Sequence, residues 1–319
     1  MESWLVGGST TTGASDLVRL ANPGAVPATV QLTVYGASGP QVPPGGSALV
    51  VPPGTERIVP LAGLILGEGA PVVHVMAAGA PVRAALQASL TRTLVPGGVD
   101  QVSAVPAAER VQVIPGVMVV SQPAQSATQN PSTILRILSP AGSATATVTV
   151  LSASGADEQQ QSIPLTAGVP AEVELSGLTA GLHTVRIEAG AQIVSAAWST
   201  TGFGAGADFA WYPAAPEVSA ATIVSVPAGP SPVLAVANPG TKAAGVRLTP
   251  VEGGSARTLT IPAGGTLVVP VAARTSYTLD PQDGARIRAS LSLAGPNALA
   301  DIPVWPEGAA ARGVLVYPG

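Results

Sequence analysis

Aromatic side chains are the most unevenly distributed groups in this sequence. The chain has ten of them, and five fall within fifteen consecutive positions. These five are Trp198, Phe203, Phe209, Trp211 and Tyr212. Exposed aromatic rings in a charge-poor protein form a platform for sugar rings or a surface for a partner protein. The cluster is therefore our candidate ligand or partner patch. The alternative, which we favour, is packing: Tyr212 and Trp305, at equivalent positions beside Pro213 and Pro306, would fill a corner between domains.

A glycine-rich stretch, TGFGAGAD at residues 201–208, resembles a loop that cradles phosphate groups. Such a loop binds an anion only when a helix follows and directs its N-terminal amides at the ligand. Here the next residues are FAWYP, a short strand pattern ending in proline. We therefore expect a hairpin loop rather than a nucleotide site.

The residues usually used for catalysis and metal binding are sparse. The chain has no cysteine and two histidines, His74 and His183, each in a strand-like segment, so we expect strand-face histidines and no zinc site. No Gly-x-Ser-x-Gly elbow is present. Asp280 and Asp283 in DPQDG offer too few oxygen ligands for calcium. We predict no catalytic, cofactor-binding or metal-ligating residue, although an unrecognised pair of hydrolytic carboxylates is a third alternative.

Composition also restricts the partners. Charged residues are only 10% of the chain and the formal net charge is -4, with thirteen arginines scattered and Lys242 the single lysine. Nucleic acid and anionic lipid need clustered basic side chains, so neither is expected as a partner. Between Val111 and Ala156 the only charged residue is Arg136. The chain contains no apolar run long enough to span a membrane.

The elements that position these residues come from an internal repeat. VRLANPGAVPATVQLTVYGASG from Val18 aligns with LRILSPAGSATATVTVLSASG from Leu135 and with LAVANPGTKAAGVRLTPVEGG from Leu234. In each copy an alternating strand meets a Pro-containing corner and a second strand returns. Asn22 and Asn238, just before the prolines, are predicted to form turns rather than to bind ligands.

Three further blocks repeat in the same order. Gly54, Gly168 and Gly264 share a column where a tight turn needs positive φ, and a glycine turn at Gly79, Gly190 and Gly284 is expected to begin an alternating strand. The last block aligns three acidic residues, each of which we expect to cap local backbone amides rather than to catalyse. They are Asp100, Asp208 and Asp301.

Roughly seven short strands per copy, turn signals at short intervals and no helical period predict an all-β protein. We expect three tandem Ig-like antiparallel β-sandwich repeats in one compact three-lobed chain, at residues 1–110, 111–216 and 217–319. A strand follows each closing proline. The last of these, RGVLVYPG from Arg312, is expected to complete the third sandwich or to pack against the first.

The motifs also resemble a known family. WLVGGSTTTGASDLVRLANPG, VQLTVYGASGP, VVPPGTERIVPLAGL and LVPGGVDQV look like an actinobacterial exported family catalogued as domain of unknown function 5719. The resemblance implies that family members carry an N-terminal membrane anchor or signal, which this chain lacks. It also implies that their genes often lie near the gene of a large membrane glycosyltransferase. It supplies no catalytic residue. The first residues, MESWLVGGSTTTG, are too polar for a signal peptide. We therefore expect this chain to be a piece of a longer exported protein, and the alternative is that Met1 is the natural N-terminus.

Together these observations predict a non-enzymatic extracytoplasmic scaffold or interaction module at the cell envelope. Its expected partner is an envelope membrane protein, such as a membrane glycosyltransferase. The alternative is a module that binds cell-wall glycan through the aromatic cluster. No cofactor is expected.

Overall fold

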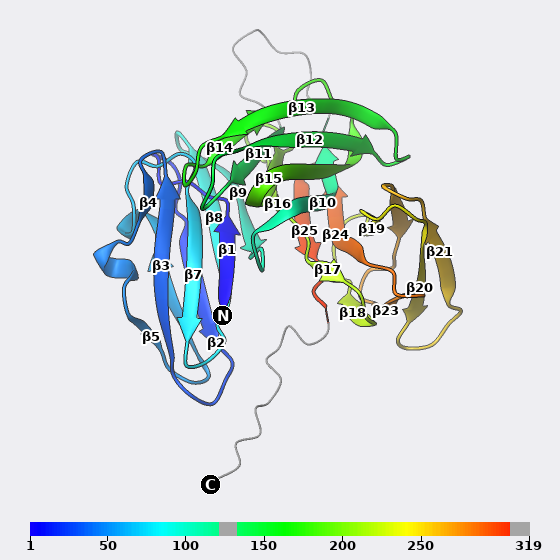
Figure 1. Cartoon of the computed structure of the whole chain (residues 1–319), viewed down its shortest axis with the longest axis horizontal. Helices are drawn as coiled ribbons and strands as arrows, with labels where there is room; N and C mark the ends of the chain where they lie inside the picture. The colour runs from blue at the N-terminus through cyan, green and yellow to red at the C-terminus, as the bar shows by residue number, and fades with distance from the viewer. Residues whose placement is uncertain (121–132, 307–319) are drawn as a thin grey trace.

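A computed structural model describes residues 1–120 and 133–306. The regular structure in these ranges is β-strand, apart from two single 3₁₀ turns, η1 (Pro44–Gly46) and η2 (Leu61–Gly63). The predicted all-β class is confirmed. The strands gather into three groups, which we name the N-terminal, middle and C-terminal lobes (Figure 1). The described part of the chain contains no helix with the length and apolar character needed to cross a membrane.

The N-terminal lobe contains two antiparallel sheets. One has the order β1-β7-β3-β4, with β5 also on β3, and the other has the order β6-β2-β8-β9. In β3 every second side chain is buried, because one face of the strand covers the core. The strands are β1 (Glu2–Val6), β2 (Leu17–Asn22), β3 (Ala28–Gly36), β4 (Gly39–Gln41), β5 (Leu49–Val51), β6 (Thr55–Pro60), β7 (Val72–Ala78), β8 (Arg83–Arg92) and β9 (Val95–Ser103).

The middle lobe is organised around one long strand, β15 (Gly181–Thr200). Its first half pairs with β10 and β12, and its second half pairs with β11 and β16. The sequence predicted a turn at Gly190, and this is wrong: the strand continues through that residue into the second group of partners. The other strands are β10 (Glu109–Val119), β11 (Thr133–Leu138), β12 (Ala144–Ser152), β13 (Asp157–Leu165), β14 (Ala171–Glu174) and β16 (Phe209–Pro213).

The C-terminal lobe again has two antiparallel sheets. Their orders are β17-β24-β19-β22, with β25 also on β24, and β18-β23-β20-β21. The segment from Arg312 lies outside the described residues. The strands are β17 (Glu217–Val218), β18 (Thr222–Ser225), β19 (Val233–Ala237), β20 (Ala244–Pro250), β21 (Arg257–Ile261), β22 (Thr266–Pro270), β23 (Ser276–Pro281), β24 (Ile287–Gly295) and β25 (Ala298–Pro303).

The repeated corners have the turn role that the sequence predicted. Asn22 is buried; its side-chain oxygen accepts the N–H of Gly24, and its amide donates to the carbonyls of Val26 and Val51. Asn238 repeats this pattern with Gly240, Lys242 and Ile261. The facing turns have the expected positive φ, of 65°, 73° and 67° at Gly54, Gly168 and Gly264.

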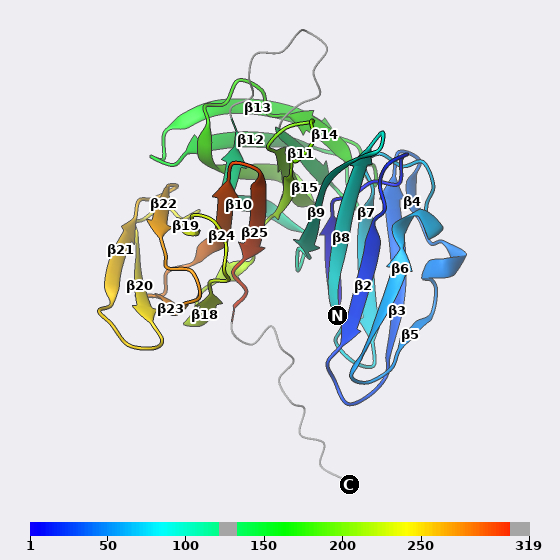
Figure 2. The ribbon, with the colours of Figure 1, turned by 180° about the vertical axis from the view of Figure 1, so that it is seen from behind.

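The closing strands of the lobes, β9, β16 and β25, approach one another at the centre of the molecule (Figure 1), and Figure 2 shows β9 and β25 from behind. Asp100 on β9 accepts the backbone N–H of Trp211 on β16 at 2.7 Å. Asp208, just before β16, accepts the N–H of Leu299 on β25 at 3.0 Å. Asp100 and Asp208 therefore join neighbouring lobes, a role that the prediction of local capping did not include. Asp100 also accepts a hydrogen bond from the backbone of the adjacent Gln101. Asp301 lies within β25, as Asp100 lies within β9.

Candidate functional site

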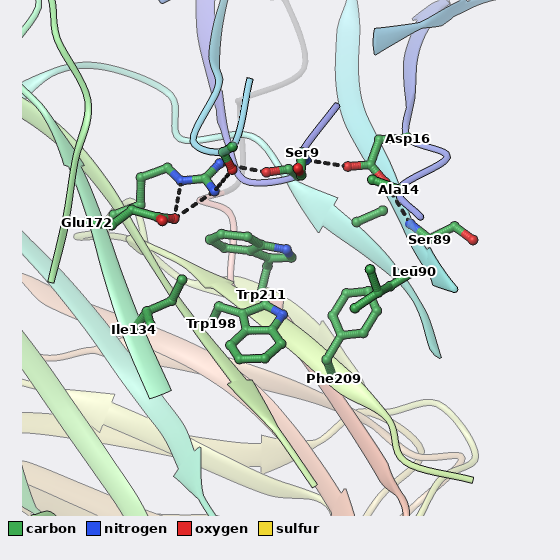
Figure 3. A pocket seen from close by; sticks show the side chains of 14 residues that line it. Ser9, Ala14, Asp16, Ser89, Leu90, Ile134, Glu172, Trp198, Phe209 and Trp211 are labelled. Carbon is green, nitrogen blue, oxygen red and sulfur yellow. Dashed lines mark hydrogen bonds and ion pairs between the residues drawn. The ribbon is translucent and has the colours of Figure 1, made fainter. Parts of the chain in front are cut away.

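A cavity of about 190 Å³ lies between the N-terminal and middle lobes. Figure 3 shows the side chains around it: a cluster of three aromatic rings, with Glu172 to one side and Asp16 to the other. Residues 8–16 and β8 supply one wall, and β11, β14, β15 and β16 supply the other. The cavity is thus formed only where two lobes meet.

The aromatic wall follows from strand register. Trp198 on β15 is paired directly with Trp211 on β16, and Phe209 is two residues before Trp211. Side chains that are directly opposed, or two apart on one strand, share a face of the sheet. The ring centres of Trp198 and Phe209 are 6.2 Å apart. Trp211 and Phe209 are buried, whereas Trp198 is only half-buried and is the ring most available to a ligand.

Arg136 on β11 belongs to the same wall as the aromatic rings, and its side chain is 2% exposed. Its guanidinium lies over the ring of Trp211, 4.7 Å from the centroid. It donates to the carbonyls of Gly8 and Pro71, at 2.9 and 2.8 Å, and to that of Gly69 at 3.2 Å. Two more N–H groups bind one carboxylate oxygen of Glu172, at 3.0 and 2.8 Å. Burial lowers the pKa of Arg136, and the charge of Glu172 opposes this shift.

Asp16 lies on the other side of the aromatic cluster from Glu172 (Figure 3). Its two carboxylate oxygens accept the backbone N–H groups of Ser89 and Ser9, at 2.8 and 2.6 Å. Burial raises the pKa of Asp16, while these hydrogen bonds and Arg136 lower it. The chain approaches this carboxylate closely at Gly8, where φ is +75° and a Cβ would lie 2.5 Å from the Asp16 oxygen. A side chain at Gly8 would therefore disturb the site.

The structure brings together only part of the predicted aromatic patch. Trp198, Phe209 and Trp211 line the cavity. Tyr212 is fully buried and faces away from it, and burial followed by the charge of Asp301 raises its pKa well above the ordinary value. Phe203 lies outside the cavity, under the guanidinium of Arg92 at 5.0 Å. Burial of Phe209, Trp211 and Tyr212 agrees with the packing alternative.

The other residues considered for chemistry have structural partners. His74 stacks on Trp4 at 4.0 Å and contacts Glu2, and His183 contacts Glu158 at 2.9 Å. The glycine-rich stretch 201–208 is followed by β16 rather than by a helix. Within residues 1–120 and 133–306, no group of three or more histidine or acidic side chains is placed to hold a metal ion.

Sequence reasoning missed the charged part of the site. Arg136, Glu172 and Asp16 were not proposed as site residues, although Arg136 is the single charge between Val111 and Ala156. A lone arginine in so apolar a stretch is a signal, because an isolated charge on a buried strand needs partners. Its partners at Gly8, Gly69 and Pro71 are backbone carbonyls of another lobe. No side-chain pattern identifies such groups.

The geometry defines an all-β protein with a small, half-open cavity that combines aromatic faces with carboxylate acceptors. Such a combination binds a small ring-shaped ligand with polar substituents. A model described as a family of unknown function (DUF5719) matches residues 1–272. The chain therefore belongs to this family. A search of curated proteins found no match.

Proposed function

We propose that this chain is a non-enzymatic, extracytoplasmic binding protein of the cell envelope, and that the cavity between its first two lobes takes a saccharide residue of a cell-wall glycan. The carrying observation is the half-buried ring of Trp198 beside the carboxylates of Glu172 and Asp16. A sugar presents an apolar C–H face to an aromatic ring and donates its hydroxyl hydrogens to carboxylate oxygens. The extracytoplasmic location and the N-terminal anchor are what the family resemblance implies.

The proposal includes the architecture: three tandem Ig-like sandwiches, at residues 1–110, 111–216 and 217–319. The strand pairings support it. In each lobe, one strand leads into the Asn or Ser corner: β2, β11 or β19. This strand pairs on one side with an edge strand of its sheet. On the other side it pairs with the strand that comes just before the closing strand of the lobe. In the middle lobe, that preceding strand is the second half of β15.

The non-enzymatic assignment is supported by how the charged groups are used. Each carboxylate oxygen of Asp16 accepts a backbone N–H, and Arg136 donates to three carbonyls and to Glu172. Groups held in this way fix the wall of the cavity. They are not poised to transfer protons to a substrate.

Titration with soluble cell-wall glycan fragments tests the glycan function. Tryptophan fluorescence should change on binding, because Trp198 lies in the cavity, and Trp198→Ala should abolish binding with little loss of stability. Trp305→Ala is the matched control, since Trp305 is also half-buried but lies outside the cavity. Absence of binding at millimolar glycan, with an unchanged tryptophan signal, would contradict the proposal.

A second candidate function is a scaffold for an envelope membrane protein such as a glycosyltransferase. It is favoured by the β8–β9 hairpin, where Leu94 is 91% exposed and Val99 is 62% exposed. Exposed apolar side chains on one hairpin are suited to protein contact. Affinity capture from membranes should then enrich an envelope protein, and the double substitution Leu94→Ser with Val99→Ser should remove it. Ile223→Ser, an exposed site in another lobe, is the control.

A further inference from the structure

The polar groups around the cavity are unbalanced between donors and acceptors. A guanidinium has five N–H donors. In Arg136 these make five hydrogen bonds: two to Glu172 and three to the carbonyls of Gly8, Gly69 and Pro71. The only cationic side chain on the cavity wall therefore has no donor left for a ligand.

The carboxylates, in contrast, keep unused lone pairs. Both bonds from Arg136 reach Oε1 of Glu172, and Oε2 accepts no hydrogen bond within the described residues. The Glu172 side chain is 35% exposed, so this oxygen is accessible. Each Asp16 oxygen accepts one N–H and retains capacity for a second. With two carboxylates and one guanidinium, the cavity wall carries a formal charge of -1.

The size of the cavity limits the ligand to one ring. Its volume of about 190 Å³ is below the ~300–1,000 Å³ of pockets that enclose drug-sized molecules. Trp198 supplies the ring face, and Glu172 and Asp16 lie on different sides of the aromatic cluster (Figure 3). The wall of the cavity thus offers carboxylate acceptors on two sides.

We propose that the cavity selects a saccharide residue without an anionic group, which stacks on Trp198 and donates hydroxyl or ammonium hydrogens to Oε2 of Glu172. An acidic sugar would place its carboxylate beside Glu172 or Asp16 with no free cationic donor to receive it. Like charges at this distance disfavour binding, and an ammonium group favours it. This inference rests on the proposed glycan function and adds the class of sugar.

The test uses methyl glycosides that differ only at carbon 6, which carries a hydroxyl, an amino group or a carboxylate. Each set is prepared in the gluco, galacto and manno series, and dissociation constants are measured by ligand-observed NMR. We expect the amino sugar to bind about threefold more tightly than the neutral sugar, and the acid at least about threefold more weakly, as exposed charge pairs typically contribute. Equal or tighter binding of the acid overturns the selectivity and leaves the glycan function standing. Binding by none of the nine compounds overturns both.

Two further measurements locate the effect. Glu172→Gln should reduce the preference for the neutral sugar over the acid to about twofold or less, because one of the two repelling charges is removed. Glu174→Gln, on the same strand but outside the cavity, should leave the preference unchanged. In the unmodified protein, high salt should shrink the same preference because ions screen exposed charges. A preference that is insensitive to both Glu172→Gln and salt would overturn the assignment to this carboxylate.

Discussion

The two junctions between lobes are held by the same kind of contact but differ in the size of the cavity beside them. At each, an arginine from one lobe donates to backbone carbonyls of the neighbouring lobe. Arg136 reaches Gly8, Gly69 and Pro71, and Arg288 on β24 reaches Ala215 at 3.0 Å. The first junction encloses about 190 Å³, whereas a cavity lined by the middle and C-terminal lobes, from Val113 to Thr266, is about 10 Å³.

The size of the neighbouring side chains explains this difference. Trp198 is eight residues after Gly190, and the residue eight after Gly284 in the C-terminal lobe is Ser292. Ser292 is fully buried, and a Cβ built on Gly116 of β10 would be 3.4 Å from it. Small residues let two backbones approach until the junction closes, while large rings hold the first junction open. Side-chain volume at one repeated position thus distinguishes the open junction from the closed one.

The largest expected effect comes from breaking the first junction at its arginine. Arg136→Met should lower the free energy of unfolding by about 5 kcal/mol, because the buried carbonyls of Gly8 and Pro71 and the partly buried carbonyl of Gly69 lose their donor, at about 1–3 kcal/mol for each buried group. Urea denaturation measures the loss. Arg19→Met is the matched control: Arg19 occupies the same repeat position, but its ion pair with Glu56 is exposed, and its removal should change the free energy of unfolding little. Similar losses for both variants would contradict a special role for the first junction.

Trp211→Ala should cost about 4 kcal/mol, as expected for removing a buried aromatic ring from a core. Trp211 is only 5% exposed, under the guanidinium of Arg136. Its thermal midpoint should therefore fall markedly, while Trp198→Ala should have a much smaller effect on stability. A Trp211→Ala protein that melts like the unmodified chain would mean that the ring is not part of the core.

Asp100 makes the contact between β9 and β16 depend on pH. Burial raises its pKa from the ordinary value of 3.8 to about 6. The folded protein therefore holds a proton that the unfolded chain releases. This stabilising contribution is complete below pH 3.8 and is lost as the pH rises to about 6, a change of about 3 kcal/mol.

Asp100→Asn removes this dependence, because the amide stays neutral at every pH and still offers an oxygen to the N–H of Trp211. The variant should gain stability relative to the unmodified protein at pH 7 but not at pH 3.5, as measured by urea denaturation across pH. For Asp157→Asn, at an exposed position on β13, the free energy of unfolding should depend on pH as in the unmodified protein. If Asp100→Asn also keeps that pH dependence, Asp100 is not the group responsible for it.

Arg288→Met tests the second junction and should have the smallest effect. It leaves one carbonyl, that of Ala215, without its donor, and it breaks a pair with Glu109, whose side chain is 39% exposed. We expect a loss of about 2 kcal/mol in urea denaturation. A loss equal to that of Arg136→Met would remove the contrast between the two junctions.

Much of the fold could be predicted from the sequence, because its signals are local. Alternation of apolar residues gave the strands, and the aligned glycines at 54, 168 and 264 marked turns of positive φ. The turn expected at Gly190 failed because β15 keeps its ladder partners through that region, with Ala146 opposite Ala189 and Ile193 opposite Glu109. Tertiary pairing there overrides the turn preference of glycine.

The site was harder to predict because its parts come from different lobes. The aromatic rings were visible as a cluster, and Trp198 and Trp211 do face one cavity. Which rings are covered depends on packing between lobes, and local patterning carries no information on that. The sequence predicted that Asp100 and Asp208 cap nearby backbone amides, because they occupy the same position in successive repeats. In the structure their carboxylates accept the N–H groups of Trp211 and Leu299 in the next lobe.

The bonds from Arg136 also have a consequence for the order in which the protein can mature on the ribosome. The N-terminal lobe completes its last ladder at Ser103, yet the donor for its carbonyls at Gly8, Gly69 and Pro71 is synthesised more than thirty residues later. Lobes emerge N-terminus first during translation. The N-terminal lobe therefore reaches its final state only after β11 has left the ribosomal exit tunnel. The middle lobe thus completes the hydrogen bonding of the N-terminal lobe during translation.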